Sequence, residues 1–384
     1  MRTEEELAVE LRAAGERAPG ETDLLAGVAL RRRRRTRRRV RTLAAALAVV
    51  VLGVGVRSVV LSGGGAGDVA STPTPAPPVP RPVPVERLWP GALSTLPVSG
   101  PDGARYQPIT AVSPTEILFA ALEPGKKGAG RLEVFDTAAG RIRLVTEVPG
   151  ARRIMMPSAS ADGENVIWLH SGRSLREIWT APLGGGAGRL VTTLRGARTD
   201  IDRITVNDGW AIWSERRGGV WRVPLTGGTP ARVPAGDGLH LLRWPWAGDV
   251  PPVRESDERD QRVLVDLSSG ASTGIVARPG TTRLRCGPRW CLGHDARGTF
   301  VQRIDGSRQR RIGGDPNRPV GAPVLDRFVP FESGVYDVET GTMATIEDDR
   351  QVVHGLSGEA GSVVYWVVGG TYRMLNLAAV PSAQ

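Results

Sequence analysis

The fold is decided by residues 160–192, SADGENVIWLHSGRSLREIWTAPLGGGAGRLVT. This stretch contains two runs of β-branched and aromatic residues, VIWL and IWTAP, which are bounded by Gly, Ser, Asp and Asn. Such runs between turn-forming residues predict two paired β-strands. Asp162-Gly163 leads into the first strand as a tight turn, and a glycine-rich turn follows the second at Pro182.

The second of these strands recurs along the chain. Seven copies are anchored at Asp136, Pro182, Pro224, Asp266, Ile304, Asp337 and Asn376. The steps between anchors are 46, 42, 42, 38, 33 and 39 residues, with a mean of 40. A period near 40 residues is typical of four-stranded propeller blades. The sequence therefore predicts an all-β, seven-bladed β-propeller, with six or eight blades as alternatives.

A second apolar run with an aromatic residue precedes most of these strands. Its copies are ILFA, VIWL, AIWS, RWCL, FVPF and VVYW, which contain Phe119, Trp168, Trp213, Trp290, Phe331 and Trp366. Aromatic residues at recurring strand positions are expected in the core between blades. The fourth unit carries WPWAGDVPPVRESDERDQ, an irregular polar insertion, in this place. Because the last unit ends near Val380, we expect a strand from residues 85–96 to close the ring.

The segment SADGENVIWLHSGRSLREIWTAPLGGGAGRLVT resembles the repeat of TolB-type, WD40-like β-propellers. In that family an S-x-D-G turn leads into the second strand, and the third strand ends near Asp or Pro. The resemblance covers about residues 100–380. The abundance of Arg, Ala, Gly, Pro and Val is typical of a GC-rich bacterial genome, for instance that of an actinobacterium, and with the N-terminal pattern described next it indicates a membrane-anchored protein of actinobacterial type. The recurring Gly-His and Trp-Asp marks of WD40 proteins proper are absent. The shared motifs are structural, so the resemblance implies a fold and no site residues.

The N-terminal region has the pattern of a single-pass membrane protein. Residues 1–42 hold 12 Arg against 7 acidic residues and are expected to form a cytoplasmic, arginine-rich tail. Residues 43–61 are apolar and would span roughly 28 Å as a helix, enough for a bilayer core of about 30 Å. A cleaved signal peptide is the alternative. Residues 62–87 predict a Gly/Pro-rich stalk, and residues 88–384 the extracytoplasmic propeller.

Few residues carry a chemical signature. Cys286 and Cys291 bracket a short turn and are expected to form a local disulfide, which an extracytoplasmic site permits. Trp244 and Trp246 flank Pro245 outside the recurring pattern and form a candidate ligand surface. The sequence predicts no catalytic, metal-binding or cofactor-binding residues, since its four histidines stand singly in different repeats.

The charge balance and the expected domain organisation narrow the range of possible functions. Outside the tail, 38 basic residues nearly balance 33 acidic ones, so a nucleic-acid partner is not indicated. The leading interpretation is a non-enzymatic module that binds or senses a protein or cell-envelope ligand. One alternative is a regulator that contacts an extracytoplasmic-function sigma factor through its tail. The other is a propeller enzyme, a lyase or a hydrolase.

Overall fold

The computed structural model describes the chain from residue 81 to residue 382, with gaps. The described ranges are 81–125, 128–148, 154–172, 175–196, 200–252, 258–312, 321–331, 333–346 and 361–382. They belong to one compact unit, Thr74–Gln384. The expected tail, the expected membrane span and most of the expected stalk lie outside them. Within these ranges, no helix has both the length and the apolar character that a membrane crossing requires.

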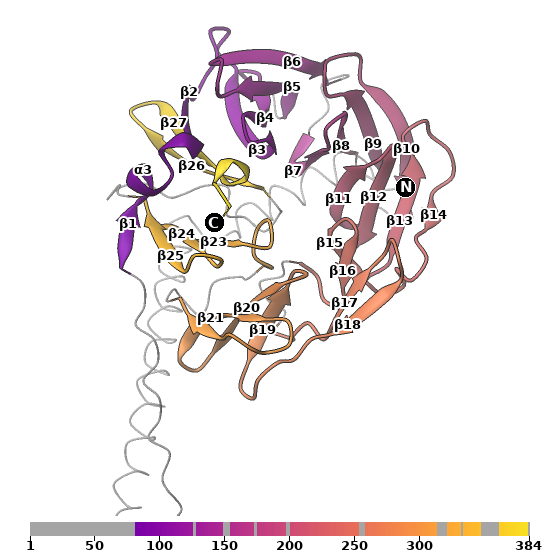
Figure 1. The fold of residues 1–384 in the computed structure, drawn as a ribbon. Helices are drawn as coiled ribbons and strands as arrows, with labels where there is room; N and C mark the ends of the chain where they lie inside the picture. The colour runs from indigo at the N-terminus through magenta and orange to yellow at the C-terminus, as the bar shows by residue number, and fades with distance from the viewer. Residues whose placement is uncertain are drawn as a thin grey trace, which may run out of the picture. The chain divides into compact units, whose positions relative to one another are not determined.

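Seven small sheets form the blades of the propeller, numbered here from 1 to 7 (Figure 1). The strands of blades 1 to 3 are β3 (Arg105–Ser113), β4 (Glu116–Leu122), β5 (Ala129–Asp136) and β6 (Arg141–Glu147); β7 (Ile154–Ala161), β8 (Asn165–Ser171), β9 (Leu175–Pro182) and β10 (Arg189–Arg195); and β11 (Ile201–Asn207), β12 (Trp210–Glu215), β13 (Val220–Pro224) and β14 (Ala231–Arg232). The strands of blades 4 and 5 are β15 (His240–Arg243), β16 (Trp246–Gly248), β17 (Val263–Asp266) and β18 (Ala271–Gly274); and β19 (Thr282–Cys286), β20 (Trp290–Asp295), β21 (Gly298–Arg303) and β22 (Arg310–Arg311). Blade 6 contains β23 (Phe328–Phe331), β24 (Gly334–Asp337) and β25 (Thr342–Thr345), and blade 7 contains β26 (Val363–Val368) and β27 (Thr371–Asn376). The seven blades confirm the count predicted from the repeat.

Two N-terminal strands complete the last two blades. β2 (Leu93–Pro97) pairs antiparallel with β27, so the closing strand expected from residues 85–96 is present in blade 7. β1 (Pro82–Pro84) pairs in parallel with β25 of blade 6, which the sequence did not indicate. Proline is tolerated there because an outermost strand needs fewer backbone donors. Figure 1 shows both strands beside their partners.

The segment between β1 and β2 belongs to the propeller core. It forms the short helix α3 (Val85–Leu88) and the 3-10 turn η1 (Pro90–Ala92). The side chains of Val85 and Trp89 are buried in a cluster with residues of blades 6 and 7. The packed part of the chain therefore begins before residue 88, where the sequence pattern placed the end of the stalk. The β1 strand was not predicted because its sequence is rich in proline, which is typical of a stalk.

The hydrophobic core consists of clusters between neighbouring blades. Trp168 lies between blades 1 and 2, Trp213 between blades 2 and 3, and Trp366 between blades 6 and 7. All three indoles are at most 1% exposed, which confirms their predicted place in the core. A further cluster joins blade 7 to blade 1, so the ring is closed by side-chain packing as well as by β2.

Polar contacts reinforce the junction between blade 7 and blade 1. The Tyr372 hydroxyl donates to the Tyr106 carbonyl at 2.8 Å, and both residues are buried. The Asn376 amide donates to the Ser113 carbonyl at 2.9 Å. These bonds satisfy buried polar groups at the place where the first and last blades meet.

Two Asp-Gly pairs between the first and second strands of a blade, Asp162-Gly163 and Asp208-Gly209, form different turns. Asp208 and Gly209 join β11 to β12 with φ of 47° and 73°, the paired positive values of a tight hairpin turn. At the other pair, the Asp162 carboxylate accepts hydrogen bonds from the backbone N–H groups of Glu164 and Asn165, at 2.8 and 2.7 Å. Both pairs connect the first strand of a blade to its second, as the sequence predicted.

Candidate functional site

A cavity of about 390 Å³ lies where the first strands of several blades meet. Its walls are residues 107–111 of β3, 159–162 at the end of β7, 203–207 of β11 and 242–244 of β15 and its turn, with Leu325, Gly361, Ser362 and Tyr365. Figure 1 shows β3, β7, β11 and β15 on the inner side of their sheets. The volume falls in the range of small-molecule sites, about 300–1,000 Å³. Most of the wall belongs to the first strands of packed blades, and Leu325, Gly361 and Ser362 come from the connecting segments.

Hydroxyl groups from neighbouring blades pair at the cavity wall. The Ser160 and Thr205 hydroxyl oxygens are 3.3 Å apart, and those of Thr110 and Ser362 are 3.1 Å apart. The Ala111 N–H also donates to the Ser362 hydroxyl at 3.0 Å. A hydroxyl group has one donor and two acceptor positions, so each pair keeps unused acceptor positions.

The charged groups of the lining are two arginines and one aspartate, Arg203, Arg243 and Asp162. The Asp162 carboxylate is held by the two backbone N–H groups of its own turn. Arg243 is exposed, and its side chain has no ion pair or hydrogen bond within the described ranges. The lining therefore has a formal charge of +1, with an available guanidinium group on it.

Two aromatic side chains complete the lining. Trp244 is half-buried and packs against the hydrophobic cluster between blades 3 and 4. Tyr365 stands edge-on to Tyr372 with ring centroids 5.4 Å apart. Burial, with a smaller contribution from Tyr372, raises the pKa of Tyr365 to about 12. Its phenol therefore remains protonated and neutral at physiological pH.

The structure separates the two tryptophans of the predicted ligand surface. Trp244 lines the cavity, whereas Trp246 lies in β16, where it pairs with Asp266 and is not part of the lining. Arg243, Tyr365 and the hydroxyl pairs were not predicted from the sequence. A weak signal was present, since Ser160 and Thr205 each stand eight residues before the second-strand tryptophan of their blade.

A buried Ser–Asp–His set joins blades 3 and 4 but is not arranged for nucleophilic catalysis. His240 Nδ1 lies 2.5 Å from Asp202 Oδ2, and the Ser214 hydroxyl donates to the other oxygen of the same carboxylate. The Ser214 hydroxyl also accepts the Leu241 N–H at 2.9 Å. Ser214 is fully buried, and its proton is directed to the aspartate instead of to an imidazole base. The set therefore acts as a link between the blades.

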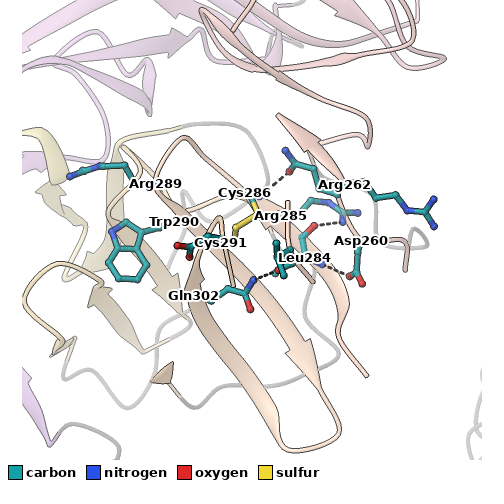
Figure 2. Close-up of a disulfide and its surroundings, with 12 residues drawn as sticks. Asp260, Arg262, Leu284, Arg285, Cys286, Arg289, Trp290, Cys291 and Gln302 are labelled. Carbon is teal, nitrogen blue, oxygen red and sulfur yellow. Dashed lines mark hydrogen bonds between the residues drawn. A yellow bond between two sulfur atoms is a disulfide. The ribbon is translucent and has the colours of Figure 1, made fainter. Parts of the chain in front are cut away.

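The predicted disulfide is present in blade 5 (Figure 2). Cys286 ends β19 and Cys291 follows the start of β20, and the two residues stand directly opposite each other. Both are fully buried. The Cys286 N–H donates to the Gln261 side-chain oxygen at 2.9 Å, which ties the hairpin to the preceding loop. The bond is thus a local staple within one hairpin.

A buried arginine holds the polar insertion against the same hairpin (Figure 2). Arg285 is 2% exposed, and its guanidinium donates to the Arg259 carbonyl at 2.6 Å. Asp260 accepts the Leu284 N–H at 2.8 Å, and burial raises the pKa of its carboxyl. These groups anchor residues 258–262 to blade 5. Among the described residues, no group of three or more His, Cys, Asp or Glu is placed to hold a metal ion.

Comparison with known proteins identifies no family for this chain. No protein-family model matches the sequence, and no curated protein is significantly similar to it. Solved structures with a similar fold include TolB from Acinetobacter baumannii, 14% identical with a TM-score of 0.35 over 55% of this chain. The chain spans 57% of that protein.

Two further propellers align over most of the chain. YCF48 bound to D1 peptide is 12% identical with a TM-score of 0.45, over 79% of this chain and 99% of that one. Oligogalacturonate lyase in complex with manganese is 11% identical with a TM-score of 0.38, over the same shares.

Proposed function

We propose that this chain is a membrane-anchored β-propeller that binds a cell-envelope ligand outside the membrane without converting it. The observation that carries the proposal is the cavity of about 390 Å³ where first strands from several blades meet. Its lining combines hydroxyl, arginine and aromatic groups, which suit reversible binding through hydrogen bonds and stacking. In the Ser214–Asp202–His240 set the serine hydroxyl donates to the carboxylate and not to the histidine, which supports binding over nucleophilic catalysis.

The membrane placement rests on the N-terminal sequence. Nine arginines between Arg31 and Arg41 stand directly before the apolar residues 43–61. Positive residues remain on the cytoplasmic side of a membrane span. The propeller, which follows the span, would then lie on the opposite side and meet envelope components.

The test places a bulky side chain in the cavity and measures whether the protein still retains a bound ligand. Thr205→Trp places an indole at the cavity wall, while Thr273→Trp makes the same change at an exposed position of β18. The full-length wild type and both variants are incubated in detergent with a solubilised envelope fraction of the source cells. Native mass spectrometry then measures the mass that each protein retains. We expect the wild type and Thr273→Trp to retain the same mass, and Thr205→Trp to lose it.

Two results would overturn the proposal. Equal retention by Thr205→Trp, in a variant that still unfolds cooperatively, would place the binding site elsewhere. Recovery of the ligand in a chemically altered form would show turnover, and would favour the enzyme alternative.

A further inference from the structure

We infer that the cavity binds an anionic sugar, with the oxyanion of the ligand held by Arg243 and the sugar ring held by the hydroxyl and aromatic groups of the wall. This inference rests on the proposed function, because it names the class of ligand for the same cavity. It follows from the charge of the lining, from the hydroxyl pairs and from the two aromatic side chains.

The charge of the lining favours an anion. Arg243 is the lining cation whose side chain has no ion pair or hydrogen bond among the described residues. The one acidic side chain of the lining, Asp162, accepts two backbone N–H groups at Oδ1 and forms no ion pair with Arg243. A guanidinium group presents a planar set of donors that matches a carboxylate or a phosphate. The field inside a cleft with low-dielectric walls strengthens this preference.

The remaining wall suits a hydroxyl-rich ring. The pairs Ser160–Thr205 and Thr110–Ser362 come from different blades and face the same cavity. A sugar hydroxyl both donates and accepts, so it matches groups that do the same. The aliphatic face of a sugar ring needs a flat apolar surface, which Trp244 offers beside Arg243.

Size agrees with a ligand of this kind. A volume of about 390 Å³ stands at the lower end of small-molecule sites, which span about 300–1,000 Å³. It accommodates one or two sugar units and excludes a folded partner. The anionic group of such a ligand is either a carboxylate or a phosphate, and the guanidinium fork accepts both.

Three hexoses that differ at one carbon distinguish the contribution of the anionic group from that of the sugar ring. D-Glucose, D-glucuronate and D-glucose 6-phosphate share a ring and differ at its sixth carbon, which carries a neutral, a carboxylate or a phosphate group. Their binding to the full-length protein is measured by isothermal titration calorimetry at low salt. We expect at least one of the two acids to bind about tenfold or more tightly than glucose, since a charge-assisted hydrogen bond contributes this much. The acid that binds more tightly identifies the anionic group.

Two arginine variants, one inside the cavity and one outside it, test whether the tighter binding of the acid arises in the cavity. Arg243→Gln removes the proposed anion contact, and Arg217→Gln removes the same charge from an exposed turn outside the cavity. We expect Arg243→Gln to reduce the advantage of the acid over glucose to less than about twofold, and Arg217→Gln to leave the advantage unchanged.

Several outcomes overturn the inference. They are equal binding of glucose and both acids, absence of binding at millimolar concentration, and an equal effect of Arg217→Gln. If none of the sugars binds but the Thr205→Trp variant still loses the envelope ligand, then the proposed function stands and the anionic-sugar inference fails. If Thr205→Trp retains the envelope ligand, the proposed function itself fails.

Discussion

The guanidinium of Arg327 forms two hydrogen bonds with the fully buried carboxylate of Asp337, Nε to Oδ1 at 3.0 Å and Nη2 to Oδ2 at 2.7 Å. Arg327 precedes β23 and Asp337 ends β24, so the pair lies at the open end of this hairpin of blade 6. Arg327 Nη1 also reaches the Val380 carbonyl at 3.5 Å, next to blade 7. The pair therefore helps to hold the last two blades together.

Removing Asp337 takes both short hydrogen bonds from the buried Arg327 guanidinium and leaves it the longer contact with Glu339, at 3.4 Å. We predict that Asp337→Ala lowers the free energy of unfolding by about 3–5 kcal/mol. The exposed pair Arg216–Asp200 serves as the control, and Asp200→Ala should cost less than about 1 kcal/mol. Urea unfolding measures both. A loss at Asp337 no larger than at Asp200 would show that the buried pair makes no special contribution.

The closing strand should contribute as much as a core strand. Leu96 of β2 is 3% exposed and packs in the cluster between blades 7 and 1. We predict that Leu96→Ala lowers the free energy of unfolding by about 2–5 kcal/mol. Val276→Ala, at a side chain that is 51% exposed, should change it by less than about 0.5 kcal/mol. If both variants unfold like the wild type, β2 does not close the ring in solution.

The disulfide should stabilise the protein modestly and leave binding intact. Its loop is short, so the chain-entropy model gives a contribution of about 2 kcal/mol for the Cys286–Cys291 bond. We predict that the double variant Cys286→Ser/Cys291→Ser loses about this amount in urea unfolding and still binds cavity ligands. Because both cysteines are fully buried, mild reductant should leave the native bond unchanged. Loss of ligand binding in the double variant would contradict a purely local role.

The Asp295–Arg311 pair predicts part of the pH dependence of stability. Hydrogen bonds from the Arg311 side chain lower the pKa of Asp295 below its ordinary value. The stabilisation is therefore complete above the pKa of the unfolded aspartate, about 3.9, and is lost as the pH falls through the lower folded value. Asp295→Asn should be less stable than the wild type at pH 7, and the difference should shrink toward pH 2.

The control for this pH dependence is Glu147→Gln, at an exposed position of β6. The difference in free energy of unfolding between Glu147→Gln and the wild type should remain constant across the same pH range. A constant difference between Asp295→Asn and the wild type at all pH values would mean that the ion pair does not form.

The sequence was sufficient to predict the blades, because the second and third strands of most blades show a recurring pattern of aromatic and β-branched residues. All seven third-strand anchors lie in or beside the expected strands, from Asp136 at the end of β5 to Asn376 at the end of β27. Aromatic and β-branched residues in these strands fill the space between blades, so the pattern is set by packing. β1 was not predicted, because prolines such as Pro82 and Pro84 are typical of an extended stalk and are also tolerated in an outermost strand.

The cavity was harder to predict because its lining is assembled from strands far apart in the sequence. Trp244 was found by its departure from the repeat, and Trp246 was grouped with it because it is two residues away. Only the strand pairing shows that Trp246 belongs to β16 instead. Tyr365 lies within an ordinary apolar run, and its place at the cavity depends on the closure of the ring. Such positions have no local signature.

The most direct test of the account is a pull-down from native membranes with the full-length protein, beside a variant that lacks residues 1–30. The account predicts that both versions retain the same envelope ligand, because the propeller is the functional unit and the tail sets topology. Thr205→Trp, in the same experiment, should lose that ligand. Recovery of a sigma factor or another cytoplasmic regulator only with the intact tail, with no ligand that depends on the cavity, would contradict the account and identify the protein as a transmembrane regulator.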